Sequence, residues 1–356
     1  MAGPLKTYAF INAKLRARIS KLLSEENFKA LAKSSSLQEA LGQLKGTDYD
    51  VLESLYVSTG DLKMGELELF SRELSVLKGV ERHIETPVLD VVQALEGKYE
   101  IENLKQALRL WFDRVIRKRS INERVGYLYR GFIEHSIDVD RLINQDTLEG
   151  LAGELSETPY GAIIAANSEE IQSSLTLFPA EIALDRFYYT LLMEAVEKLS
   201  DRDRSIAKRL IIADIDLENL NWLIRMKDFY DIPPADIASH LLPWGGMRLA
   251  GGEIDQLSGS RGSGDLVSEY IARQYSQLKP LLSVQTTGVY NRLALMEKIF
   301  HEIMMLEIQH MLYGYPFTIG IILAYFFLKK MEIQKITGIL NGQFYEFPAE
   351  RMAGLL

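Results

Sequence analysis

The chain of 356 residues contains no cysteine. Disulfide bonds and cysteine-based zinc sites are therefore excluded, and a cytoplasmic location is the simplest expectation. Histidine is also scarce, with five residues at positions 83, 135, 240, 301 and 310. His301-Glu302 begins like a zinc-protease helix, but Met305 occupies the place of the second histidine. We therefore expect each histidine to be hydrogen-bonded or solvated, and we expect no bound metal.

Long apolar runs and nucleotide-binding loops are missing as well. The longest apolar run, residues 317–328, is shorter than the roughly 20 residues of a spanning helix, so it predicts a buried core helix. No Gly-x-x-x-x-Gly-Lys-Ser/Thr phosphate loop occurs, and the segment Gly259–Gly264 lacks the strand and lysine that such a loop needs. This segment is interpreted as a flexible loop. We expect no direct nucleotide binding and no cofactor.

The composition is that of a globular protein, with 47% hydrophobic and 25% charged residues. A formal net charge of -9 argues against general affinity for nucleic acid or for an anionic membrane. Alternation of apolar and polar residues over four to eight positions is almost absent, which predicts a nearly all-α chain.

The distribution of charge is uneven at the start of the chain. Residues 1–24 carry no acid and include five basic residues: Lys6, Lys14, Arg16, Arg18 and Lys21. A transit peptide or a membrane-surface helix has this composition, but the segment has no apolar h-region. Its apolar stripe, Ile11, Leu15, Ile19 and Leu22, favours a first helix docked on the rest of the protein.

One motif recurs along the chain at a fixed interval. Glu100-Ile-Glu-Asn-Leu-Lys-Gln-Ala-Leu-Arg109 returns as Asp216-Leu-Glu-Asn-Leu-Asn-Trp-Leu-Ile-Arg225, and in weaker form as Glu332-Ile-Gln-Lys-Ile-Thr-Gly-Ile-Leu-Asn341. The leading acids are 116 residues apart, from 100 to 216 to 332. A fixed long period indicates internal triplication. We interpret the chain as three helical modules, residues 1–120, 121–233 and 234–356.

Each copy places apolar residues on one helical face, in steps of three and four. The sets are Ile101, Leu104 and Leu108; Leu217, Leu220 and Ile224; and Ile333, Ile336 and Leu340. The leading acid suits the first turn of a helix, where a carboxylate meets the positive end of the helix dipole. Apolar residues at helical spacing precede it too, so the acid marks either a helix start or a bend inside a longer helix.

Shorter features repeat around this motif. Ser36 and Thr147 each precede a short leucine-rich helix that ends in a Thr-x-Tyr turn, at Thr47-Asp-Tyr49 and Thr158-Pro-Tyr160. A degraded third counterpart falls within Gly264–Tyr270. Phe229–Pro233 corresponds to Phe344–Pro348 at the module ends, and Tyr127–Gly131 to Leu241–Gly245 at the junctions.

No catalytic constellation stands out. Glu100 and Glu102 are two residues apart and lie on different sides of a helix, which is poor geometry for an acid–base pair. Asn103 and Asn219 are either binding residues or partners of the backbone at a helix bend. The repeated polar positions form one set, interpreted as structural: Glu100, Asn103, Arg109, Asp216, Asn219, Arg225 and Glu332.

The densest basic run is a candidate partner-binding surface. It consists of Arg114, Arg117, Lys118 and Arg119. With aromatic residues nearby, such a run can contact RNA or a lipid headgroup, whereas a solvated helix end is the commoner explanation.

Taken in order, these residues resemble the C subunit of archaeal and bacterial V-type (A-type) ATPases, called the d subunit in eukaryotes. The resemblance is carried by Tyr8 with Asn12–Arg16, the two Thr-x-Tyr turns, the repeated acid motif, and Tyr325 preceding Glu332. It covers almost the full chain. The third copy departs from the pattern, with Lys335 in the place of Asn and Asn341 in the place of Arg.

The resemblance implies a non-catalytic rotor subunit: three similar modules about a pseudo-threefold axis, forming a funnel. Such a funnel is a socket between the central stalk, subunits D and F, and the membrane proteolipid ring. The chain would then be a monomer within a hetero-oligomeric complex, peripheral on the cytoplasmic face, transmitting torque for ion transport in ATP synthesis or hydrogen ion transport. Two alternatives stay open: a helical repeat scaffold for another protein, and an enzyme whose site is built from scattered residues.

Overall fold

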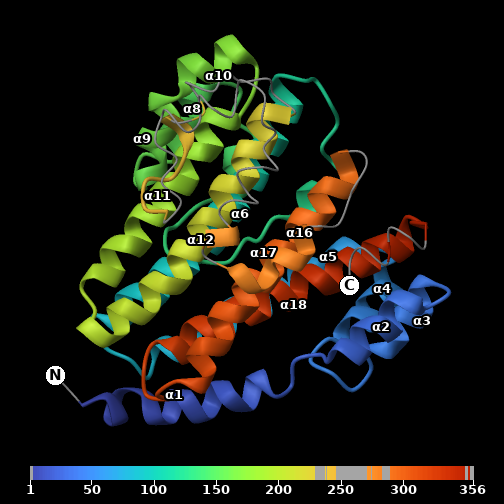
Figure 1. Cartoon of the computed structure of the whole chain (residues 1–356). Coiled ribbons are helices and arrows are strands. Elements are labelled where there is room, and N and C mark those ends of the chain that lie inside the picture. The colour runs from blue at the N-terminus through green and yellow to red at the C-terminus, as the bar shows by residue number, and fades with distance from the viewer. Residues whose placement is uncertain are drawn as a thin grey trace. The chain divides into compact units, whose positions relative to one another are not determined.

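The computed structural model describes residues 3–228, 237, 239–245, 271–273, 275–282, 289–348 and 352. Over these residues every regular element is a helix (Figure 1). The prediction of an all-α chain is therefore confirmed. Two compact units are distinguished, the first comprising Met1–Leu199 with Glu332–Gly354 and the second Ser200–Met331.

The first unit holds the N-terminal helices and the end of the last long helix. Its helices are α1 (Pro4–Ile19), α2 (Glu25–Lys33), α3 (Leu37–Gln43), α4 (Val51–Thr59), α5 (Leu62–Glu81), α6 (Val88–Val115), η1 (Val125–Tyr127), α7 (Val139–Ile143), α8 (Leu148–Glu154), α9 (Pro159–Ala166), α10 (Ser168–Ser174) and α11 (Phe178–Glu197). The second unit contains α12 (Asp201–Asp228), η2 (Ser276–Leu278), α16 (Lys279–Leu282), α17 (Val289–Tyr313) and the first part of α18 (Gly320–Phe344).

Side-chain caps set several helix starts, as the sequence predicts. Ser36 accepts a hydrogen bond from the Glu39 backbone N–H at 3.2 Å, and Thr147 accepts one from Gly150 at 3.0 Å. Both bonds satisfy backbone donors that the first helical turn leaves free. Glu39 returns the contact to the Ser35 backbone N–H at 2.7 Å, one residue before the expected cap.

The two Thr-x-Tyr turns have the same hydrogen bonds. Thr47 donates to the Leu44 carbonyl at 2.6 Å and accepts from the Tyr49 N–H at 3.1 Å. Thr158 donates to the Leu155 carbonyl at 2.8 Å and accepts from the Tyr160 N–H at 3.2 Å. Each turn therefore fixes the backbone that carries a buried tyrosine.

The first helix is docked along one face, as predicted. Tyr8, Ile11 and Leu15 are buried. The Lys14 ammonium also donates to the carbonyl of Gly79 near the end of α5, at 3.2 Å.

Three long helices, α6, α12 and α18, carry the repeated acids at interior positions. Glu100, Asp216 and Glu332 each lie more than two turns from both ends of their helix. The alternative that the acid starts a helix was therefore wrong. Buried residues on the preceding turns, such as Val92 and Leu95, extend the apolar face and continue the helix.

The apolar faces of the repeats are largely core. Seven of the nine residues are described: Ile101, Leu104, Leu108, Ile336 and Leu340 are buried, and Leu217 and Ile333 are half-buried. The apolar run that starts α18 is buried from Thr318 to Phe327, which confirms a core helix. Among the described residues, no helix combines the length and apolar character needed to span a bilayer.

Some predicted features lie outside the described residues. These are the segments Phe229–Pro233, Gly259–Gly264 and Gly264–Tyr270, and the side chains of Leu220, Ile224 and Arg225.

Replacing Leu104 by Ala should lower the free energy of unfolding by about 2–5 kcal/mol, because a buried leucine leaves a cavity when truncated. Urea denaturation measures this change. Leu191→Ala is the matched control, since Leu191 on α11 is 42% exposed and its truncation should cost far less. Equal effects for the two variants would show that the repeated face is not core.

Candidate functional site

The acid of the first repeat is a buried hub for two other segments of the chain. The two oxygens of Glu100 accept four hydrogen bonds: from the Tyr160 hydroxyl at 2.8 Å, from His135 Nδ1 at 2.6 Å, and from the backbone N–H groups of Glu134 and His135 at 2.8 and 2.7 Å. Only 4% of Glu100 is exposed. Burial and the adjacent carboxylate raise the pKa of Tyr160, so its hydroxyl remains a donor.

The acid of the third repeat makes the matching contact with the start of the chain. Glu332 accepts a hydrogen bond from the hydroxyl of Tyr49 and another from the Leu23 backbone N–H at 2.6 Å. Tyr49 and Tyr160 are the tyrosines of the two Thr-x-Tyr turns. The same tyrosine–acid pair therefore occurs twice, each time between a long helix and a distant turn.

The asparagines of the first two repeats hold the junction segments. Asn103 donates to the Tyr129 carbonyl and accepts from the Tyr129 N–H, both at 2.9 Å. Asn219 makes the same pair of bonds with Leu242, at 3.0 and 2.7 Å. Both asparagines thus bond backbone, as one of the two sequence interpretations proposed, but the backbone belongs to a junction instead of a helix bend.

The acid of the second repeat is the most buried of the three, with 1% of Asp216 exposed. Gly245 in its junction segment lies so close that an added Cβ would be 2.3 Å from the Asp216 carboxylate. A side chain at this position would therefore require the Asp216 carboxylate to move.

A polar network joins α6 to α11, which is a major helix contact of the first unit. Lys98 and Lys105, two turns apart on α6, both reach Asp185 of α11, with Lys98 at 3.3 Å. One turn further, Arg109 pairs with Glu181 at 2.7 Å. Its bond to Glu181 raises the pKa of Arg109, so the guanidinium stays charged.

The third repeat keeps this contact despite its changed residue. Asn341 of α18 donates to Glu66 of α5 at 3.2 Å, as Arg109 of α6 does to Glu181 of α11. Leu340 lines one small cavity with Leu62 and Leu69 of α5. Within the second unit, Arg209 of α12 pairs with Glu307 of α17. Every long helix thus packs on a helix outside its own predicted module.

A second carboxylate cluster lies one turn before Glu100 on α6. Oxygens of Glu81, Glu96 and Glu134 lie within 4.8 Å of one another, and the Lys78 ammonium pairs with all three carboxylates. This ammonium already supplies the positive charge that a metal would bring. Burial raises the pKa of Glu96 to about 8, with Lys78 opposing the shift and Glu81 and Glu134 adding to it.

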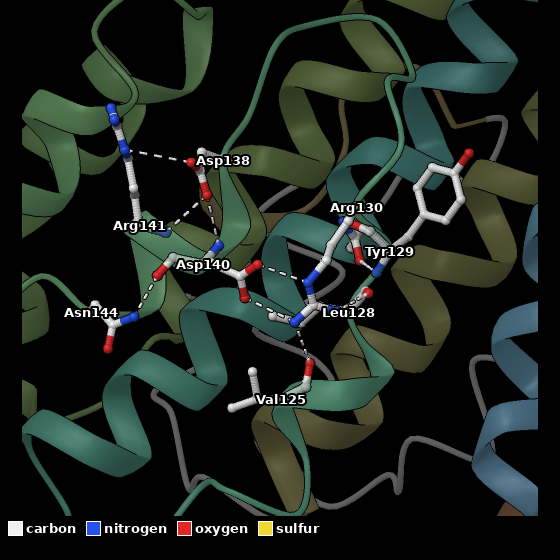
Figure 2. Close-up of polar contacts among 9 residues, drawn as sticks. Val125, Leu128, Tyr129, Arg130, Asp138, Asp140, Arg141 and Asn144 are labelled. Carbon is white, nitrogen blue, oxygen red and sulfur yellow. Dashed lines mark hydrogen bonds and ion pairs between the residues drawn. The ribbon is translucent and has the colours of Figure 1, made fainter.

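The junction after α6 is held by one arginine (Figure 2). Arg130 donates to both oxygens of Asp140 at 2.7 and 2.8 Å, and to the carbonyls of Leu128 and Val125 at 3.0 and 3.1 Å. The bidentate pair lowers the pKa of Asp140. The chain between α6 and α7 is therefore fixed next to the residue that Asn103 binds.

The predicted basic run ends α6 and is not uniform. Arg114 donates to the carbonyls of Ile143, at 2.9 Å, and Gln145. Arg117 pairs with Asp113 at 3.1 Å, and Lys118 has a left-handed backbone with φ of 55°. The Arg119 N–H then bonds the Asp113 carbonyl at 2.8 Å, which closes the helix end. Arg117, Lys118 and Arg119 are exposed, whereas Arg114 is half-buried and ties α6 to the segment after α7.

Sequence reasoning identified the repeated polar residues but missed their partners. Lys98, Lys105 and Asp185 were not singled out, although Lys98 and Lys105 are spaced to share a helical face with Arg109. His135 is hydrogen-bonded, as expected of the histidines.

Tyr160→Phe should lower the free energy of unfolding by roughly 1–3 kcal/mol, because a buried carboxylate loses one of its donors. Tyr49→Phe should have a similar effect through Glu332. Tyr56→Phe on α4 is the control, and urea denaturation is the measurement. A double-mutant cycle with Glu100→Gln isolates the Tyr160–Glu100 bond. A coupling of zero would show that the contact contributes nothing.

Glu96→Gln should remove a pH dependence of stability. The folded protein keeps the Glu96 proton up to about pH 8, whereas the unfolded side chain ionises near its ordinary pKa of 4.5. The folded state therefore binds more protons in this window, and the stability of the natural protein falls as pH rises through it. The difference in melting temperature, variant minus natural protein, should therefore increase as the pH is raised from about 5 to about 9. A constant difference would contradict the burial of a protonated carboxyl.

The chain is similar to known proteins over most of its length. A model of the ATP synthase (C/AC39) subunit matches residues 11–355. The C subunit of the A-type ATP synthase of Methanosphaera stadtmanae is 25% identical over 277 residues, covering 76% of this chain and 67% of the relative. The corresponding C subunit of Methanocaldococcus jannaschii is 22% identical over 366 residues, covering 100% of this chain and 88% of the relative.

A third relative, the C subunit of the A-type ATP synthase of Thermococcus gammatolerans, is 24% identical over 345 residues, covering 92% of this chain and 84% of the relative. These matches confirm the resemblance found in the sequence. Since the family model spans nearly the whole chain, the chain belongs to the ATP synthase (C/AC39) subunit family.

Proposed function

We propose that this chain is the non-catalytic coupling subunit of a rotary A/V-type ATPase. It is a socket that joins the central stalk, subunits D and F, to the membrane proteolipid ring, and it transmits torque for ion transport. It acts as a monomer within the complex, peripheral on the cytoplasmic face of the membrane. Family membership supports a place in the rotary complex.

The proposed socket role is supported by the cyclic order of contacts among the three modules. Taking the modules as residues 1–120, 121–233 and 234–356, α6 of the first packs on α11 of the second, and α12 of the second packs on α17 of the third. The end of α18, in the third, returns to α5 of the first through Asn341 and Glu66. The tyrosine–acid pairs follow the same order, from Glu100 to Tyr160 and from Glu332 to Tyr49.

A cycle of this kind supports a pseudo-threefold funnel. Each module contributes one long helix and receives the long helix of the module before it, so each module is paired with both of the others. In the proposed funnel, a rotation of one module would break polar contacts with the next one. Stiffness of this kind is what transmission of torque requires.

The buried charges serve this packing instead of a reaction. Glu100 accepts four hydrogen bonds from protein donors, and the carboxylates of Asp185 and Glu181 are matched by cations of α6. A group saturated by fixed partners is a poor general base, because its lone pairs are already engaged.

The exposed part of the basic run is the proposed contact with the membrane sector. Arg117, Lys118 and Arg119 extend from the helix end that Asp113 closes. Although burial alone would raise it, Arg124 and Arg117 hold the pKa of Asp113 below its ordinary value, so the anchor of the run stays ionised. We set Arg114 apart from this surface, because its guanidinium holds internal carbonyls.

Reconstitution with stripped membranes tests both the proposed role and the surface. The natural chain should rebind the membrane sector with the central stalk and restore coupled ion pumping. The variant with Arg117, Lys118 and Arg119 replaced by Ala should rebind more weakly, and high salt should weaken the natural chain in the same way. Folding should be spared, because exposed charges add little stability.

The control replaces Lys29, Lys33 and Lys45, which are exposed on α2 and after α3, by Ala. This variant loses the same charge from another surface, so it should rebind like the natural chain. Equal binding by both variants would remove the basic run from the contact. Copurification with neither ring nor stalk would instead support a helical scaffold for another protein.

A further inference from the structure

The outer face of α1 carries exposed apolar side chains and takes no part in the contacts proposed above. Tyr8, Ile11 and Leu15 bury the inner face, and Lys14 anchors it to α5. On the solvent side, Leu5 is 59% and Phe10 is 57% exposed. Since the inner face is already docked, these apolar side chains are available to another surface.

The charge of this helix is opposite to that of the whole chain. Residues 3–23 contain five cations and no carboxylate, while the formal net charge of the protein is -9. Lys6, Arg16 and Lys21 are exposed. The neighbouring turn between α5 and α6 adds the exposed Arg82 and the ring of His83, whose centroid is 4.5 Å from that of Phe10.

We propose that the outer face of α1 binds an anionic phospholipid surface. A convex helix with exposed Leu and Phe side chains among Lys and Arg residues fits the plane of a bilayer interface. There the apolar side chains enter the headgroup region and the cations meet lipid phosphates. Each basic side chain near an anionic surface adds to binding, whereas the acidic remainder of the chain is repelled. The helix therefore sets which side of the protein faces the membrane.

This surface is separate from the basic run that ends α6, and the inference does not require the ring or the stalk. Vesicles without protein test lipid binding directly, while failure of the proposed function would appear only in reconstitution with the membrane sector. The two results are therefore distinguishable.

The test is sedimentation of the full chain with vesicles of phosphatidylcholine alone or with added phosphatidylglycerol. The natural chain should bind the mixed vesicles at low salt and lose binding at high salt. The variant Lys6→Gln, Arg16→Gln, Lys21→Gln should bind on the order of a hundredfold more weakly, from about 1 kcal/mol for each charge. Leu5→Ser should also weaken binding, without a change in salt dependence.

The matched control is Lys29→Gln, Lys33→Gln, Lys45→Gln, which removes the same charge from α2 and the turn after α3. This control should bind like the natural chain, and all variants should keep the melting temperature. Equal loss in both triple variants would overturn the proposal, because binding would then follow net charge. Absence of binding to mixed vesicles would also overturn it. If the α1 variant then failed only in reconstitution, the partner of α1 would be an acidic protein surface.

Discussion

A carboxylate in the middle of a buried helix needs donors from elsewhere in the chain, because the turns around it already bond to one another. Glu100 and Glu332 are 4% and 5% exposed, and removal of a carboxylate from water is costly unless it is hydrogen-bonded. The donors come from a tyrosine turn and from a backbone segment in each case. Each acid therefore fixes where two distant segments lie, and the packing of the long helices follows from this.

The charged residues between helices also determine how neighbouring helices align. Lys105 and Asp185 are both buried, and pairs of this kind contribute little net stability compared with apolar residues of the same size. They do penalise any register in which one partner loses the other. Pairing along α6 and α11, and again between Asn341 and Glu66, thus favours one alignment of each long helix on its neighbour. Such a fixed alignment is what the proposed coupling role would require.

The third copy of the motif shows which of its residues and contacts are kept when the sequence changes. Asn341 replaces the arginine of the first copy, yet it also reaches a glutamate on the neighbouring helix. Lys335 replaces the asparagine, and its ammonium lies 4.5 Å from the ring centroid of Phe28 and 3.4 Å from a carboxylate oxygen of Glu25. Only the leading acid keeps both its carboxylate and its type of partner, a tyrosine of a Thr-x-Tyr turn. The acid is thus the invariant part of the contact in the two described cases.

The sequence by itself determined the features that depend on local or periodic pattern. These were the all-α class, the caps at Ser36 and Thr147, the docked face of α1 and the buried face of the repeats, since spacing of three and four residues and the first helical turn fix them. The start of the long helices was left open, because an acid preceded by apolar residues at helical spacing suits both a first turn and a bend inside a longer helix.

The tertiary structure decided which residues meet. Tyr49 and Glu332 are 283 residues apart, and Tyr160 and Glu100 are 60 apart. No local preference encodes such a pairing, because the free energy of a long-range contact depends on burial and on the groups that surround it. For the same reason the division of the basic run, with Arg114 turned to internal carbonyls and Arg117 to Arg119 exposed, could be seen only once the chain after α6 was in place.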